Sequence, residues 1–159
     1  MADYRFVTHW RIEAPAGDVW EAIFHSEHWP DWWSSVRRVI DVSPGDDRGI
    51  GAVRRYVWRS RLPYTLTFDV RATRIERPTL LEGVASGELA GTGLWQFSTN
   101  GTVTTVQHTW EVQTTRGWMN LLAPAARALF AWNHAYSMHE GARGLARLLR
   151  ARLLESSHA

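Results

Sequence analysis

The chain contains no cysteine and no lysine. The absence of cysteine excludes disulfide bonds, thiolate nucleophiles and thiolate metal ligands. No apolar run approaches the roughly 20 residues that a membrane span needs, so we expect no integral membrane contact. Residues 1–5 do not combine a basic start with an apolar stretch, which is the pattern of a secretory signal. Together these absences predict a cytoplasmic protein.

Tryptophan, by contrast, is abundant. Ten of the 159 residues are tryptophan, while the formal net charge is only +2. Each indole carries an N–H group that needs a hydrogen-bond partner or a wet edge, so routine core packing does not explain all ten. A pocket lined partly by aromatic side chains would accommodate them. At this length a single domain spanning residues 1–159 is expected.

The N-terminal part predicts a strand and two helices. Apolar and polar residues alternate over 4–13, which is the pattern of a half-buried strand. Pro15 suits the first turn of a helix, and an apolar stripe at helical spacing follows over 19–24. Pro30 then favours a second short helix that ends near Trp33.

The remaining chain predicts strands and then one long helix. Asn100-Gly101 is the strongest hairpin signal, because both residues tolerate positive φ. From Trp118 the period changes to that of a helix, which we expect to reach about Leu153. The predicted strands are 36–42, 52–58, 64–74, 80–86, 94–98 and 103–113.

Several short motifs in this order carry a family resemblance. They are Ala14-Pro15-x-x-x-Val19-Trp20, Trp29-Pro30-x-Trp32, Gly91-x-Gly93-x-Trp95-x-Phe97, Val106-x-His108-x-Trp110, and Phe130-x-Trp132-Asn133-His134 with Met138. With them the chain resembles the SRPBCC superfamily of START-like, Bet v-type helix-grip proteins, and within it the bacterial polyketide cyclase/dehydrase branch. The resemblance implies an α+β fold. A curved seven-stranded antiparallel sheet would wrap around the long C-terminal helix (about 118–153), with two short helices between the first two strands. It also implies a cavity for an apolar or amphipathic ligand.

The expected cavity wall combines inward strand residues with one face of the long helix. An apolar wall with a few polar groups is typical of a ligand pocket, although ordinary core packing would show the same aromatic spacing. The candidates from the strands are Trp10, Tyr56, Trp58, Phe68, Trp95, His108 and Trp110. Those from the helix are Leu122, Leu129, Trp132, Asn133, Tyr136 and Glu140.

Three of these residues are candidates for acid–base chemistry: His108, Tyr136 and Glu140. His108 shares a face with Val106 and Trp110, and an imidazole can exchange protons with a ligand carbonyl near neutral pH. The alternative is a histidine satisfied by a cross-strand partner. Asn133, Tyr136 and Glu140 share one side of the helix, where an amide, a hydroxyl and a carboxylate could orient a ligand and shuttle a proton. The alternative is that Asn133 and Glu140 lie on the boundary and bond to loops or solvent.

Two further clusters have simpler interpretations. His25 and His28 stand at helical spacing with acidic neighbours, but no third metal ligand is evident, so we expect helix capping and no metal site. Gly91 and Gly93 lie in a glycine-rich segment without the lysine of a phosphate loop, and we interpret them as bulge or close-approach positions in a curved strand. We expect no cofactor.

Basic residues near the C-terminus are Arg143, Arg147, Arg150 and Arg152. Anionic lipid or nucleic acid would suit such a face, but a solvated face at a helix C-terminus explains it more simply. We therefore expect no nucleic-acid partner.

Three functions remain open from the sequence. The first is the binding of a small hydrophobic or aromatic molecule, such as a polyketide, a lipid or an aromatic metabolite, by a monomer or homodimer. The second is a polyketide aromatase/cyclase or dehydratase that acts on a poly-β-ketone. The third is a protein that binds a macromolecular partner through its sheet or its arginine-bearing helix.

Overall fold

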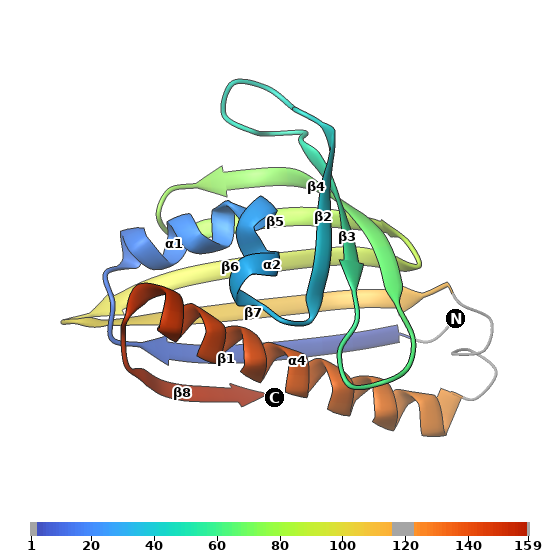
Figure 1. The fold of residues 1–159 in the computed structure, drawn as a ribbon. Helices are drawn as coiled ribbons and strands as arrows, with labels where there is room; N and C mark the ends of the chain where they lie inside the picture. Colours follow the sequence, from blue (N-terminus) through green and yellow to red (C-terminus); the bar gives the residue numbers. More distant parts are fainter. Residues whose placement is uncertain (1–2, 116–122, 159) are drawn as a thin grey trace.

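The computed structural model describes residues 3–115 and 123–158. Its centre is an eight-stranded antiparallel sheet that curves behind a long helix (Figure 1). The strand order is β2-β3-β4-β5-β6-β7-β1-β8. The strands are β1 Asp3–Ile12, β2 Val36–Ser43, β3 Val53–Trp58, β4 Leu66–Glu76, β5 Leu80–Gly87, β6 Leu89–Asn100, β7 Val103–Thr114 and β8 Leu153–His158. The helices are α1 Ala16–Phe24, the 3-10 turn η1 Ser26–His28, α2 Trp29–Trp32 and α4 Ala123–Leu149.

The two short helices between β1 and β2 form where the sequence predicts them. Pro15 caps the N-terminus of α1 in an extended conformation, and Val19, Trp20 and Ile23 form its buried stripe. Pro30 occupies the first turn of α2, where its missing N–H costs no hydrogen bond. The α+β class and the helix-grip arrangement are therefore confirmed.

Trp32 and Trp33, at the end of α2, pack against the middle of α4. Trp33 donates its indole N–H to the carbonyl oxygen of Ser137 at 2.8 Å. Gly141 lies against the Trp33 ring, and Gly144 lies against the carbonyl oxygen of Trp32, so that a Cβ atom at either glycine would overlap its neighbour. These two glycines, which weaken the helix locally, allow the close approach of the two helices.

The strand β6 bends closely over β7. Gly91 adopts a φ of +154°, and a Cβ atom there would collide with the backbone of Glu111. A Cβ atom on Gly93 would lie 2.8 Å from the ring of Trp110. The interpretation of these glycines as close-approach positions is confirmed.

The C-terminal part of the prediction is wrong in two respects. The helix α4 ends at Leu149 and does not reach residue 153. Arg150 adopts a positive φ of 52°, which reverses the chain, and Leu153–His158 then pair with β1 as an eighth strand. The predicted start of the helix at Trp118 falls outside the described residues.

Candidate ligand-binding cavity

A cavity of about 270 Å³ lies between the sheet and α4. The strands β3 to β7 supply one wall, the inner face of α4 supplies another, and α1, η1 and α2 close one side. The border of the cavity includes Pro44, Arg74 and Glu82. Pro44 and Arg74 are exposed to solvent, so the mouth of the cavity lies between the β2–β3 connection and the β4–β5 hairpin.

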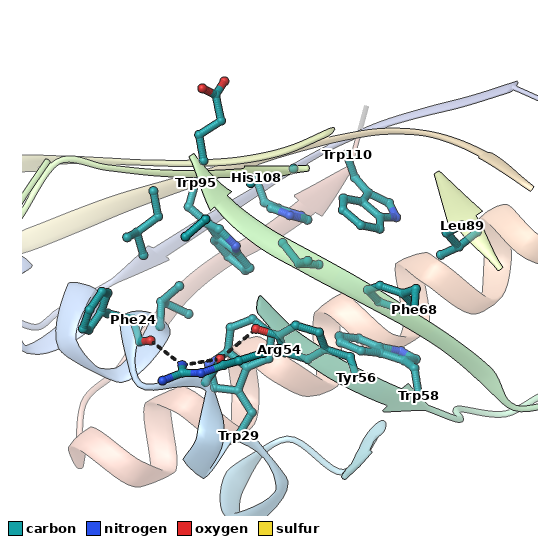
Figure 2. A pocket seen from close by; sticks show the side chains of 18 of the residues that line it. Phe24, Trp29, Arg54, Tyr56, Trp58, Phe68, Leu89, Trp95, His108 and Trp110 are labelled. Atoms are coloured by element: carbon teal, nitrogen blue, oxygen red, sulfur yellow. Dashed lines mark hydrogen bonds between the residues drawn. The ribbon is translucent and has the colours of Figure 1, made fainter. Parts of the chain in front are cut away.

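Aromatic side chains form most of the strand wall. Figure 2 shows them pointing into the same space from neighbouring strands. The rings of Tyr56 and Phe68 lie 5.8 Å apart, and those of Phe68 and Trp110 lie 5.7 Å apart. Trp95 and Trp29 face each other at 6.1 Å. Because alternate residues of a strand point to the same face, the period-two pattern brings these rings together.

Two histidines, the buried His108 and the partly buried His134, supply the polar part of the wall. The His108 ring stacks on Trp95 at 4.1 Å, and the His134 ring stacks on Phe6 at 4.2 Å. The Nδ1 atom of His108 and the Nε2 atom of His134 have no hydrogen-bond partner among the described residues. Both side chains line the cavity, from β7 and α4 respectively.

Burial keeps these imidazoles neutral. It lowers the pKa of His108 to about 3. It also lowers the pKa of His134 well below its ordinary value, and the nearby His108 adds to this effect. A neutral imidazole retains one N–H donor and one acceptor nitrogen, so each ring can exchange hydrogen bonds with an uncharged ligand.

A polar network lies where the turn η1 meets β3. Arg54 donates to the hydroxyl of Ser26 at 2.8 Å and forms an ion pair with Glu27 at 2.7 Å. Ser26 and the hydroxyl of Tyr56 are 2.7 Å apart. Asp41 accepts a further hydrogen bond from Arg54 at 3.0 Å. Figure 2 shows Arg54 reaching the turn after α1 from the side of the cavity. The carboxylates of Glu27 and Asp41 balance the charge of its guanidinium group.

Asn133 lines the cavity but also holds a loop. Its side-chain oxygen accepts hydrogen bonds from the backbone N–H of Arg61 at 3.0 Å and of Leu62 at 3.3 Å. This is the loop-bonding alternative considered from the sequence. Asn133 therefore lines the cavity and at the same time holds the β3–β4 connection against α4.

Seven of the sequence candidates line the cavity, and Trp10 does not. Trp10 is fully buried and packs against Trp33 at 5.7 Å and Trp95 at 5.6 Å, both of which line the cavity. It therefore supports the wall from behind. The seven are Tyr56, Trp58, Phe68, Trp95, His108, Trp110 and Asn133.

The predicted placement of the other helix candidates is wrong. Leu129 and Trp132 are 52% and 50% exposed and lie on the outer side of α4. Tyr136 and Glu140 also lie away from the cavity lining, which removes two of the three acid–base candidates from its wall. Leu122 lies outside the described residues.

The helix residues that do line the cavity are Phe130, Asn133, His134 and Met138. These residues also follow one another at helical spacing. The sequence of α4 therefore contains two apolar stripes, this one and the exposed one with Leu129 and Trp132, and hydrophobicity alone does not show which of them faces the cavity. Trp29 and Arg54 were also missed as lining residues. Trp29 sits in the indole-rich segment already singled out. Arg54 lies two residues before the candidate Tyr56 in β3, so the period-two pattern places both on the cavity face.

His25 bonds to carboxylates of its own neighbourhood. Its ring nitrogens lie 3.1 Å from Glu21 and 2.9 Å from Glu27. Within residues 3–115 and 123–158, no three histidine, aspartate or glutamate side chains are grouped to hold a metal ion. In the same part of the chain, no helix is long and apolar enough to cross a membrane.

Comparison with known proteins identifies relatives of this fold. A family model described as polyketide cyclase/dehydrase and lipid transport matches residues 4–150. The crystal structure of the Zhui aromatase/cyclase from Streptomyces sp. R1128 is similar with a TM-score of 0.77 at 14% identity, over 94% of each chain. A search of curated protein sequences finds no match.

Two further structures share the architecture. The di-domain ARO/CYC protein BexL of the BE-7585A biosynthetic pathway has a TM-score of 0.70 at 19% identity, over 94% of this chain and 51% of BexL. Ginseng major latex-like protein 151 from Panax ginseng has a TM-score of 0.66 at 11% identity, over 92% of this chain and 97% of that protein. At these identities the likeness is one of fold.

Proposed function

Because the chain belongs to the polyketide cyclase/dehydrase and lipid transport family, we propose that its cavity binds a small, largely apolar aromatic or polyketide-like molecule. The observation that carries the proposal is the wall itself, which combines stacked indole and phenyl rings with two neutral imidazoles. Such a wall favours a flat, uncharged ligand with one or two oxygen atoms.

The cavity volume limits the size of that ligand. An apolar cavity of about 150 Å³ holds one benzene molecule. A volume of about 270 Å³ is therefore suited to a molecule of roughly two or three fused rings. The unpartnered nitrogens of His108 and His134 favour hydrogen bonding with a hydroxyl or carbonyl group, because a buried polar atom without a partner costs free energy.

The first test is native mass spectrometry of the protein purified from its own host, beside a denatured control. A co-purifying small molecule that is lost on denaturation would support the proposal and give the ligand's mass. A titration with the neutral fluorophore N-phenyl-1-naphthylamine then locates the site. We expect Ala72→Phe, which fills the cavity, to abolish binding. Val84→Phe on the exposed outer face of β5 is the matched control. Equal binding by both variants would refute the assignment.

A second candidate function is aromatase/cyclase activity. The observation in its favour is His108, because a neutral buried imidazole can polarise a ligand carbonyl as a hydrogen-bond donor. Ring closure would then need the cavity to fold a poly-β-ketone so that the reacting carbons meet. The same low pKa makes His108 a weak base, and Tyr136 and Glu140 lie outside the wall, so binding is the better supported function.

This second function has its own test. Wild type and His108→Phe are incubated with a linear poly-β-ketone mimic, and the aromatic product is followed by absorbance. Turnover by wild type that is lost in the variant, with fluorophore binding retained in both, would support catalysis. Retention of full turnover by the variant would exclude His108 from the reaction.

A further inference from the structure

A second surface of α4 has a composition unlike the rest of the helix. Residues spaced by three or four positions form one stripe along the side of α4 that faces away from the cavity. Leu129 and Trp132, about half exposed, lie in its first half. Arg143 and Arg147, also exposed, lie in its second half. We call this the outer stripe, and its residues are Ala125, Leu129, Trp132, Tyr136, His139, Arg143 and Arg147.

The apolar half of the outer stripe carries a positive charge at its edge. The guanidinium of Arg61 lies 5.2 Å from the centre of the Tyr136 ring, and the Trp132 ring lies 6.0 Å from the same ring. Arg61 is itself exposed. The aromatic rings and the cation therefore form one connected surface that is open to solvent.

Negative charge is nearly absent from α4 itself. The sequence of α4 contains a single acidic residue, Glu140, which is 22% exposed and lies 3.9 Å from Arg143. No acidic residue lies among the exposed positions of the helix. A helix with tryptophan and leucine beside arginine, and little opposing charge, matches the composition of helices that lie in a membrane interface.

We propose that the outer stripe docks on the surface of an anionic lipid bilayer. Trp132 and Leu129 would enter the boundary between headgroups and acyl chains, where the amphipathic indole is favoured. Arg143, Arg147 and Arg61 would contact lipid phosphates, to which guanidinium groups donate paired hydrogen bonds. The positive charge of these arginines complements an anionic lipid surface. A second copy of this chain docked on the same stripe would instead bring arginines of like charge towards one another.

Vesicle flotation of the intact chain tests this proposal. The vesicles contain phosphatidylcholine alone or phosphatidylcholine mixed with phosphatidylglycerol. We expect binding only to the anionic vesicles, with weakening as salt is added. The Arg143→Gln/Arg147→Gln variant should bind about thirtyfold more weakly, since each arginine near such a surface contributes about a factor of five. Trp132→Ala should lose about tenfold through its lost apolar contact.

The matched control lies on the opposite side of the molecule. Arg71 and Val84 are register partners on β4 and β5, and both are exposed on the outer face of the sheet. The variant Arg71→Gln/Val84→Ala removes a cation and an apolar group from there and should bind like wild type. Thermal unfolding of each variant establishes that it is folded.

Three outcomes would overturn the proposal. One is failure of wild type to float with anionic vesicles. The second is an equal loss of binding in the control variant. The third is that Trp132→Ala changes the molar mass in light scattering, which would assign the stripe to self-association. If vesicles do not bind, binding of an oligonucleotide to this face would assign the stripe to nucleic acid.

Discussion

Acidification from pH 8 to pH 5 should destabilise the protein through His108. Its imidazole is buried between Trp95 and Trp110, and its pKa is lowered to about 3, whereas in the unfolded chain it returns to about 6.5. Between these two values the unfolded chain binds a proton that the folded protein does not. Stability that is present above pH 6.5 is therefore lost as the pH falls towards 3.

The magnitude follows from proton linkage. At pH 5 the unfolded imidazole is about 1.5 pH units below its pKa, while the folded one is still neutral. The free energy of unfolding should therefore fall by about 2 kcal/mol between pH 8 and pH 5 on account of His108 alone. Burial also lowers the pKa of His134 and of His158, so both groups add to the loss in the same direction.

Urea unfolding of wild type and His108→Phe at both pH values isolates this contribution. The phenyl ring keeps an aromatic group between the same neighbours and removes the titration. The difference between the two pH values should be smaller in the variant by about 2 kcal/mol. His28→Gln, which removes a histidine whose side chain is 70% exposed, is the matched control. If the free energy of unfolding of His108→Phe depended on pH as strongly as that of wild type, this would falsify the conclusion that His108 is buried in its neutral form.

Two further predictions concern the packing of α4. Gly144→Ala would place a methyl group against the carbonyl oxygen of Trp32 and should destabilise the protein by about 3 kcal/mol. Gly17→Ala in α1 is the control: its methyl group would meet open space, so the variant should be neutral or more stable by up to about 1 kcal/mol. Urea unfolding measures both, and a harmless Gly144→Ala would contradict the close helix contact. Trp33→Ala should cost about 3–5 kcal/mol because its ring is buried, while the half-exposed Trp132→Ala should cost less than about 1 kcal/mol. Equal losses in calorimetry would argue against the observed orientation of α4.

The sequence predicts local structure well where the signal is itself local. Asn100-Gly101 marks the hairpin between β6 and β7, in which Asn100 pairs with Val103 and Gly101 has a φ of +63°. Pro15 and Pro30 mark the two short helices for a related reason, because proline fixes φ and glycine permits positive φ without help from distant residues.

The orientation of α4 could not be obtained in this way. One stripe contains Leu129 and Trp132, the other contains Phe130 and Met138, and both are apolar at helical spacing. The choice depends on contacts across the chain, such as the hydrogen bond from Trp33 to Ser137. An amphipathic helix with two aromatic faces therefore leaves its own rotation undetermined. Six of the seven strand candidates line the cavity, and only Trp10 does not, because period two leaves a strand residue only two faces to choose from.

The eighth strand escaped prediction for a related reason. Residues 153–158 follow the helix with two leucines, which extend the helical pattern by hydrophobicity alone. They form a strand because β1 offers unpaired backbone groups beside them, and those groups come from the other end of the chain. Strand formation of this kind depends on a partner that a local pattern does not contain.

The pairing of β8 with β1 also determines which backbone groups remain open to other molecules. The free margins of the sheet are β2 and β8. β2 carries the exposed Arg37 and Arg38 and shifts register twice against β3, and β8 has only six residues. Charge, irregularity and shortness all discourage strand addition. Without β8, the ten-residue β1 would become the margin, with a longer and more regular row of open N–H and C=O groups. Pairing with β8 thus covers a long, regular row of backbone groups with which a strand of a neighbouring molecule could otherwise pair.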